Sequence, residues 1–166
     1  MIFGIATFTL IHVVLSLVGI IAGLVVAGGL VAGKRLDRWA VVFLVATILT
    51  SVTGFGFPFV KFLPSHAVGI VSLVVLPAVI VAHYVKHFAG GWRSTYAVGV
   101  VLATYLNAFV LVAQLFRRIP VLFLAAPTQS EPPFALTQAL VLALFVWLAV
   151  AAVRGFRAEP APAQMR

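Results

Sequence analysis

The chain contains no cysteine and very few acidic side chains among its 166 residues. Without cysteine it can form no disulfide, thiolate metal site, iron–sulfur cluster or thiol nucleophile. It has three Asp and Glu residues in all, and charged residues of both signs make up 8% of the sequence. A soluble domain needs far more polar surface to cover its core, so this composition excludes that class.

Apolar residues make up 64% of the chain, and the mean hydropathy is +1.23. A helix needs about 20 apolar residues to span a bilayer. Five charge-free runs are suited to this, at residues 2–31, 39–57, 65–85, 94–116 and 134–153. We therefore predict an all-α integral membrane protein: one five-helix transmembrane bundle over residues 1–157, followed by a flexible cytoplasmic tail at 158–166.

The basic residues lie between the apolar runs and predict an orientation. Cytoplasmic loops of membrane proteins are enriched in Lys and Arg. If the N-terminus is outside, eight cations fall on the inner side and three on the outer side, namely Lys61, Arg117 and Arg118. We thus expect an outer N-terminus and a cytoplasmic C-terminus. Because the cations flank helices, we expect contact with anionic lipid head groups and no binding of nucleic acid.

Polar side chains are costly in hydrocarbon, so their positions carry functional information. If Lys34 fixes the inner end of the first run, the span begins near residue 11 and His12 lies about one turn from the outer face. The same reasoning places further polar side chains in the outer leaflet. They are His66, Asn107 and Gln114.

The first run also has a face of small and polar residues. His12, Ser16, Gly19 and Gly23 lie within about 60° of one another at 100° per residue. The spacing of the two glycines permits close approach between membrane helices. We interpret this face as a contact within the bundle, which turns His12 and Ser16 inward.

The connection at residues 117–133 is long and mixed in character. Its apolar stretch at 121–126 is too short to span, so we expect it to lie in the interface or to dip back over the bundle. Thr128, Gln129 and Glu131 would then lie near His12 and His66. Glu131 precedes two prolines, so it is also a candidate cap of the last helix, or the acidic member of a capping box with Thr128.

These residues predict a polar pocket in the outer leaflet. The candidate ligand-binding residues are His12, Ser16, His66, Asn107, Gln114, Gln129 and Glu131. The function that we favour is non-enzymatic binding or passage of a quinone-like head group, a small metabolite or a proton. We assign no catalytic residue, because the chain has no glycine-rich phosphate loop and no HExxH motif. Pro77 can kink the third span and make room for a cavity.

Two alternatives stay open. His12 and His66, on different helices at one depth, could ligate a haem b and make the protein an electron-transfer cytochrome. The protein could instead be a non-catalytic accessory subunit of a larger membrane complex or a homo-oligomer. The small residues that would favour such a contact are Gly28, Gly29 and Gly33.

A second pair of histidines, His83 and His87, has the spacing of two ligands on one helical face. A third ligand is missing, and the nearest carboxylate in the sequence, Asp37, belongs to a loop that we expect to be distant. We therefore interpret this segment, with Tyr84 and Trp92, as an interfacial anchor.

Four segments resemble a family of uncharacterised small multi-pass bacterial membrane proteins. They are TSVTGFGFPF at 50–59, PSHAVGIVSL at 64–73, YLNAFVLVAQ at 105–114 and APTQSEPPF at 126–134. The resemblance implies a multi-pass protein of the bacterial inner membrane and carries no function. With b561-type cytochromes the chain shares one loose feature, a histidine in the first helix. The second, fourth and fifth predicted spans contain no histidine.

Overall fold

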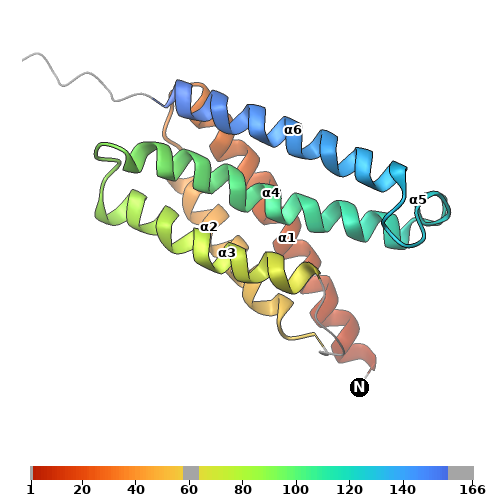
Figure 1. The fold of residues 1–166 in the computed structure, drawn as a ribbon. Coiled ribbons are helices and arrows are strands. Elements are labelled where there is room, and N and C mark those ends of the chain that lie inside the picture. The colour runs from red at the N-terminus through yellow and green to blue at the C-terminus, as the bar shows by residue number, and fades with distance from the viewer. Residues whose placement is uncertain (1, 58–63, 157–166) are drawn as a thin grey trace, which may run out of the picture.

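The structure, a computed structural model, describes residues 2–57 and 64–156, which are helical apart from short connections (Figure 1). Its long helices are α1 (Ile2–Val31), α2 (Asp37–Gly54), α3 (Pro64–Ile80), α4 (Trp92–Arg118) and α6 (Pro132–Gly155). A π-helical turn, η1 (Val81–Val85), extends α3, and a short helix, α5 (Pro120–Ala125), joins α4 to α6. Five helical spans are long and apolar enough to cross a membrane, with α3 and η1 together forming one of them.

The predicted all-α, five-span architecture is thus confirmed for the described residues. The predicted boundaries were too short for α4 and α6, which extend two residues further at each end, and α2 lies at 37–54 instead of 39–57. The third span, predicted at 65–85 with Pro77 as a possible kink, contains Pro77 within α3, and its last turn is π-helical. The predicted tail at 158–166 lies outside the described residues.

Successive long helices run in opposite directions, so chain segments far apart in sequence meet at two ends (Figure 1). One end, which we call the basic end, holds the described cations Lys34, Arg35, Arg38, Lys86, Arg93 and Arg154. The other end, which we call the opposite end, holds the start of α1, the end of α2 and the α4–α5–α6 connection. Arg117, Arg118 and Glu131 are the acidic and basic residues described there.

Helix α1 lies against α2, α4 and α6, while α3 lies against α2 and α4. The glycines of α1 make this close packing possible. A Cβ atom on Gly19 would lie 3.1 Å from Thr47 Oγ1 of α2 and 3.6 Å from Asn107 Nδ2 of α4. A Cβ atom on Gly23 would overlap the Thr104 hydroxyl. The interpretation of the glycine face as a contact within the bundle is therefore confirmed.

The glycines at the end of α1 serve mainly the turn into α2. Gly33 has a φ of +70°, and the amides of Gly33 and Lys34 donate to the carbonyls of Leu30 and Gly29. This is the hydrogen-bond pattern of a Schellman motif, which favours glycine at the left-handed position. Gly29 packs on Leu36, so Gly28 alone of the three proposed contact glycines has open space where a Cβ would lie.

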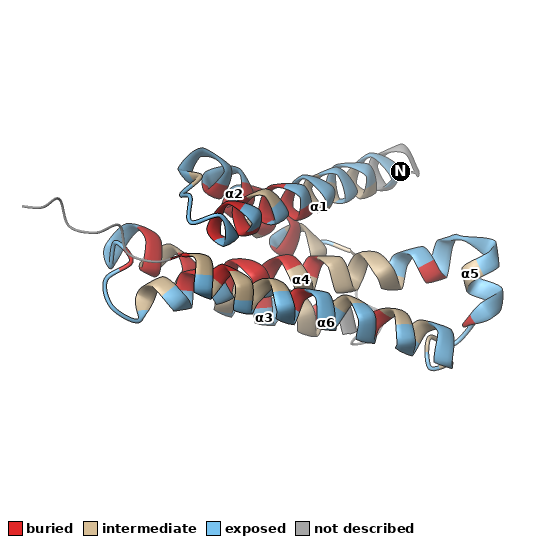
Figure 2. Cartoon of the chain, turned by 90° about the horizontal axis from the view of Figure 1, so that it is seen from above, coloured by how far each residue is buried: buried red, intermediate tan, exposed pale blue. Residues whose placement is uncertain are grey.

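The interior contains an apolar layer toward the basic end. Its central side chains are at most 1% exposed and come from α1, α2, α3 and α4: Val26, Phe43, Leu76, Val79 and Val100. Figure 2 shows buried residues concentrated where α1, α2 and α4 meet, and many exposed ones in the coloured part of the N-terminal half of α1. In both views the N-terminal half of α1 diverges from α4 and α6 (Figures 1 and 2).

Substitution of Gly23 tests the close contact of α1 with α4. Gly23→Ala forces the buried Thr104 side chain to shift, since its Cγ2 would lie 2.9 Å from the new Cβ. We expect a loss of roughly 1–3 kcal/mol in unfolding free energy, as for other overpacked cores. Thermal unfolding of the detergent-purified protein, followed by circular dichroism, measures this loss.

Gly28→Ala is the matched control on the same helix, because nothing lies within 4 Å of the Cβ position. It should leave stability unchanged or raise it slightly, since alanine favours helix over glycine. The double variant Gly23→Ala/Thr104→Ala should regain part of the loss. Equal behaviour of the two single variants would contradict the packing described here.

Candidate functional site

A line of polar side chains follows the contact of α1 with α2 and α4. We call it the polar seam, and its members are His12, Ser16, Thr47, Thr50, Thr53 and Asn107. Thr47, Thr50 and Asn107 are buried, and the other three are half-buried. On α2 the threonines recur every third residue, so they lie near one face. Because α1 and α2 are antiparallel, His12 meets Thr53 while Gly19 meets Thr47.

His12 is held by Thr53. Its Nδ1 lies 2.9 Å from Thr53 Oγ1, and the Thr53 hydroxyl lies 2.7 Å from the Leu49 carbonyl. A hydroxyl has one proton to donate, and the carbonyl can only accept it. When Thr53 donates this proton to the Leu49 carbonyl, it accepts from Nδ1–H of His12, and the lone pair of the imidazole then lies on Nε2. The His12 ring also packs edge-on against Phe57, with ring centroids 5.1 Å apart.

Three buried atoms of the polar seam have no hydrogen-bond partner among the described residues. They are Thr47 Oγ1, Thr50 Oγ1 and Asn107 Nδ2. Two of these atoms, on Thr47 and Asn107, lie within 4 Å of the Cβ position of Gly19. Each unsatisfied buried group costs about 1–3 kcal/mol, and lipid offers no hydrogen bonds in compensation. The seam thus presents donors that the described residues leave unused.

The remaining predicted site residues lie in other places. His66 is buried, and its ring centroid lies 6.1 Å from that of Phe55. Both predicted histidines therefore pack on aromatic residues that follow α2, His12 on Phe57 and His66 on Phe55. Gln114 is exposed near the end of α4. The structure therefore places His12 and Asn107 along the contact of α1 with α2 and α4, whereas Gln114 is on the surface and Ser16 is half-buried on α1.

Gln129 and Glu131 organise the connection between α5 and α6. Gln129 Nε2 donates to the Ala113 carbonyl of α4 at 2.6 Å. The Glu131 carboxylate accepts from the Thr128 hydroxyl at 2.8 Å and from the amides of Thr128 and Ser130, each at 3.1 Å. The predicted pairing of Glu131 with Thr128 is confirmed. Its predicted capping role is wrong: Glu131 occupies the N-cap position of α6, but its side chain makes no capping hydrogen bond.

These hydrogen bonds set the acidity of Glu131. Partial loss of hydration raises the pKa of its carboxyl, but the hydrogen bonds from Thr128 and Ser130 together outweigh this effect. The pKa therefore lies below its ordinary value of 4.5. Glu131 is a carboxylate at neutral pH, and its oxygens are occupied by its own loop. In Figures 1 and 2 α5 lies apart from the N-terminal half of α1.

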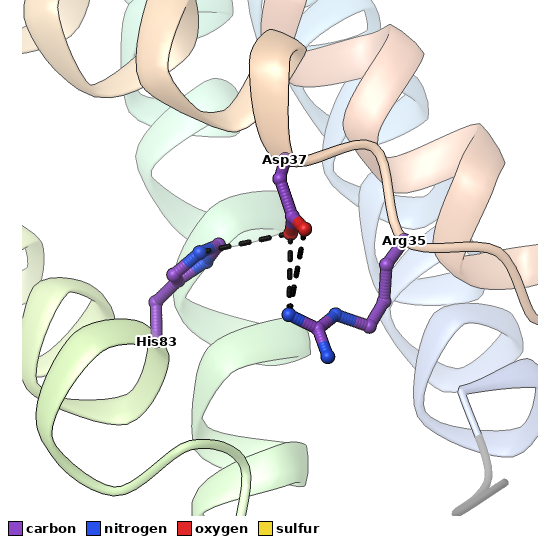
Figure 3. Close-up of polar contacts among 3 residues, drawn as sticks. All are labelled: Arg35, Asp37 and His83. Carbon is purple, nitrogen blue, oxygen red and sulfur yellow. Dashed lines mark hydrogen bonds and ion pairs between the residues drawn. The ribbon is translucent and has the colours of Figure 1, made fainter.

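A second polar cluster lies at the basic end, where Asp37 stands between Arg35 and His83 (Figure 3). Asp37 Oδ1 is 3.6 Å from His83 Nε2, and both of its oxygens are 3.4 Å from Arg35 Nη2. His83 is buried within the π-helical turn, and its Nδ1 has no partner in the described part of the chain. The Arg35 guanidinium lies 4.6 Å from the centroid of the Phe88 ring.

This cluster corrects two predictions. Asp37 was expected to be distant, but the antiparallel packing of the bundle places it against the end of α3. His83 and His87 were expected to share a helical face, but η1 ends at Val85 and His87 has a φ of +45°. Across residues 2–57 and 64–156, no group of three or more His, Asp or Glu side chains is placed to hold a metal ion.

Comparisons of the chain with protein-family models, with characterised proteins and with solved structures give no match.

The seam threonines were missed by the sequence reasoning. Imidazole and amide groups in an apolar run indicate a site more strongly than hydroxyl groups do. A hydroxyl group can donate to a carbonyl of its own helix, so by itself it is a weak indicator of a binding site. Thr53 and Thr104 do so, but Thr47 and Thr50 do not. The available signal was the spacing of Thr47, Thr50 and Thr53 within one apolar run, on the helix that follows the glycine face.

The Glu131 loop makes a testable pH prediction. A carboxyl whose pKa is lowered by folding contributes stability above its ordinary pKa, and this contribution disappears as pH falls through the folded value. The Thr128 and Ser130 amides should therefore exchange slowly with solvent at pH 5–7, after correction for intrinsic rates, and lose this protection below about pH 4. Hydrogen-exchange mass spectrometry measures it. Glu131→Gln should reduce the protection at pH 5–7, where the wild-type residue is a carboxylate; unchanged protection in that variant would contradict the loop assignment.

Proposed function

We propose that the protein binds a small hydrogen-bonding ligand within the membrane, without catalysing a reaction, and that the polar seam is its binding site. The ligand class is a quinone-like head group or another small molecule that carries carbonyl or hydroxyl oxygens. The observation that supports this proposal best is the pair Thr47 and Asn107, whose unpartnered polar atoms face the Cβ position of Gly19 from two different helices.

The chemical reason is the cost of unused donors in hydrocarbon. A membrane helix rarely carries Asn unless the amide has a partner or a function. Leu or Val at position 107 or 47 would fill the buried helix contact without this cost. A ligand oxygen that accepts from Asn107 Nδ2 and the Thr47 hydroxyl recovers the lost hydrogen bonds. This recovery stabilises the complex relative to the free protein.

His12 adds a hydrogen-bond acceptor to the donors of the polar seam. Its Nε2 lone pair can accept a hydrogen bond, because Thr53 uses the Nδ1 proton. His12 lies seven residues before Gly19 on α1, about 10 Å along the helix axis. The ligand therefore meets donors deep in the seam and an acceptor near the opposite end, where α1 diverges from α4 and α6 (Figure 2).

We further infer that the basic end faces the cytoplasm and that the protein resides in a bacterial inner membrane. Six described cations lie at the basic end and two at the opposite end, in the direction that the enrichment of cytoplasmic loops in Lys and Arg favours. In this orientation the ligand enters the seam from the outer leaflet.

Thermal unfolding with a water-soluble benzoquinone tests the proposed site, since its two carbonyls match the seam donors. The wild-type protein should gain about 2.7 kcal/mol of stability at a concentration one hundred times Kd. Thr47→Val and Asn107→Leu should abolish this gain. Without ligand, both variants should be as stable as wild type or slightly more stable, because each removes an unsatisfied group.

Thr104→Val is the matched control. Its hydroxyl is buried like that of Thr47, but it already donates to the Val100 carbonyl at 2.7 Å. This variant should keep the benzoquinone-dependent gain. Absence of any gain in the wild-type protein, or an equal gain in Thr47→Val and Asn107→Leu, would refute the proposal.

Haem b is the competing ligand, because the hydrogen bond to Thr53 leaves His12 Nε2 as the coordinating nitrogen. Orientation of this kind, through the other ring nitrogen, is usual for histidine ligands of metals. An absorption spectrum from 350 to 650 nm, before and after dithionite reduction, decides between the two. We expect a colourless protein; a Soret band that disappears in His12→Ala and in His66→Ala would replace our proposal with electron transfer.

A further inference from the structure

The membrane-facing surface has a groove between α3 and α4, with a volume of about 540 Å³. Its apolar walls are formed by Val74, Val75, Ala78, Val98 and Gly99. Val74 is 70% exposed, so this wall is open to the bilayer. Ala78 and Gly99 are the smallest residues of its lining, and a Cβ atom on Gly99 would lie 2.5 Å from Cγ2 of Val79 in α3.

The end of the groove nearest the basic end is polar. It is formed by Ser94 and Thr95, in the first turn of α4. Arg93 precedes them directly, and Lys86 reaches across from the end of η1, where its amine lies 5.8 Å from the Trp92 ring centroid. Positive helix-dipole charge at the start of α4 adds to these two cations.

Among residues 2–57 and 64–156, acidic side chains do not balance the charge at this end. Asp37 is the only carboxylate described at the basic end, and Arg35 and His83 already lie against it. The cations beside the groove thus favour an anion from outside the chain. An apolar channel that starts at a cationic, hydroxyl-bearing rim has the shape of one lipid molecule: a chain in hydrocarbon and a phosphate at the interface.

We propose that this groove is a binding site for one anionic phospholipid. An acyl chain lies along Val74, Ala78 and Val98, and the phosphate is bound by Arg93, Lys86 and the Ser94 hydroxyl. The lipid covers the contact between α3 and α4 on the membrane side. This site is separate from the polar seam and does not depend on the function proposed there.

Native mass spectrometry of the full chain in detergent tests this site. Equal amounts of phosphatidylglycerol and phosphatidylcholine with identical acyl chains are added, and the retained lipid is counted. One phosphatidylglycerol should be retained in preference to phosphatidylcholine. Arg93→Gln should lower that retention roughly fivefold, since a cation near the interface contributes about 1 kcal/mol to binding of anionic lipid. Val98→Phe, which fills the groove, should abolish it.

Two matched controls separate this site from general lipid contact. Leu140→Phe changes a side chain that is 72% exposed on α6, and Arg117→Gln removes a cation at the opposite end. Both should retain phosphatidylglycerol as wild type does. If Val98→Phe misfolds by circular dichroism, Ala78→Leu fills the groove from α3 and should give the same loss.

Three results would overturn the proposal. They are equal retention of the two lipids by wild type, wild-type retention in both groove-filling variants, and displacement of the lipid by glycerophosphoglycerol, which has the same head group and no acyl chains. The last result would assign the cations to a soluble phosphate ester instead of a lipid.

Discussion

The close approach of α1 to α2 and α4 is the contact on which the rest of the structure depends. Gly19 and Gly23 leave no side chain between the helices, so Thr47, Thr104 and Asn107 reach the backbone of α1. Membrane helices gain little from burying apolar surface against one another, because lipid is equally apolar; close packing and hydrogen bonds must hold them together. This close contact fixes α1 in the bundle. It also encloses polar atoms of Thr47 and Asn107 that have no hydrogen-bond partner among the described residues.

Polar chemistry is consequently divided between three separate regions. Thr47, Asn107 and His12 lie along the helix contact, the Asp37 cluster connects the start of α2 to η1 at the basic end, and Glu131 orders a loop at the opposite end. The residues at the two ends are engaged mainly with their neighbours. Only in the polar seam do several buried donors face one another across helices without partners among the described residues, and this difference is why we place ligand binding there.

Composition and run length were sufficient to predict the five spans, because a bilayer imposes one length and one kind of surface on every crossing helix. The glycine face of α1 also predicted its packing role. Contacts between distant segments were not predictable: depth along the membrane grouped His12 with Gln114, whereas the divergence of α1 separates their helices at that depth (Figure 2). Asp37 and His83 were missed for the converse reason, since antiparallel topology, not sequence distance, brings them together.

The apolar layer of Val26, Phe43, Leu76, Val79 and Val100 has an electrical consequence. Its residues are almost completely buried and carry no dipolar side chains, whereas the seam on one side and the basic end on the other are polar. A membrane voltage therefore falls mainly across this layer, where the dielectric constant is lowest. A charge that crossed it would experience up to about 2.3 kcal/mol for every 100 mV. A ligand bound in the seam, as we propose, would stay on one side of that drop, so its occupancy would follow its concentration and depend little on the membrane voltage.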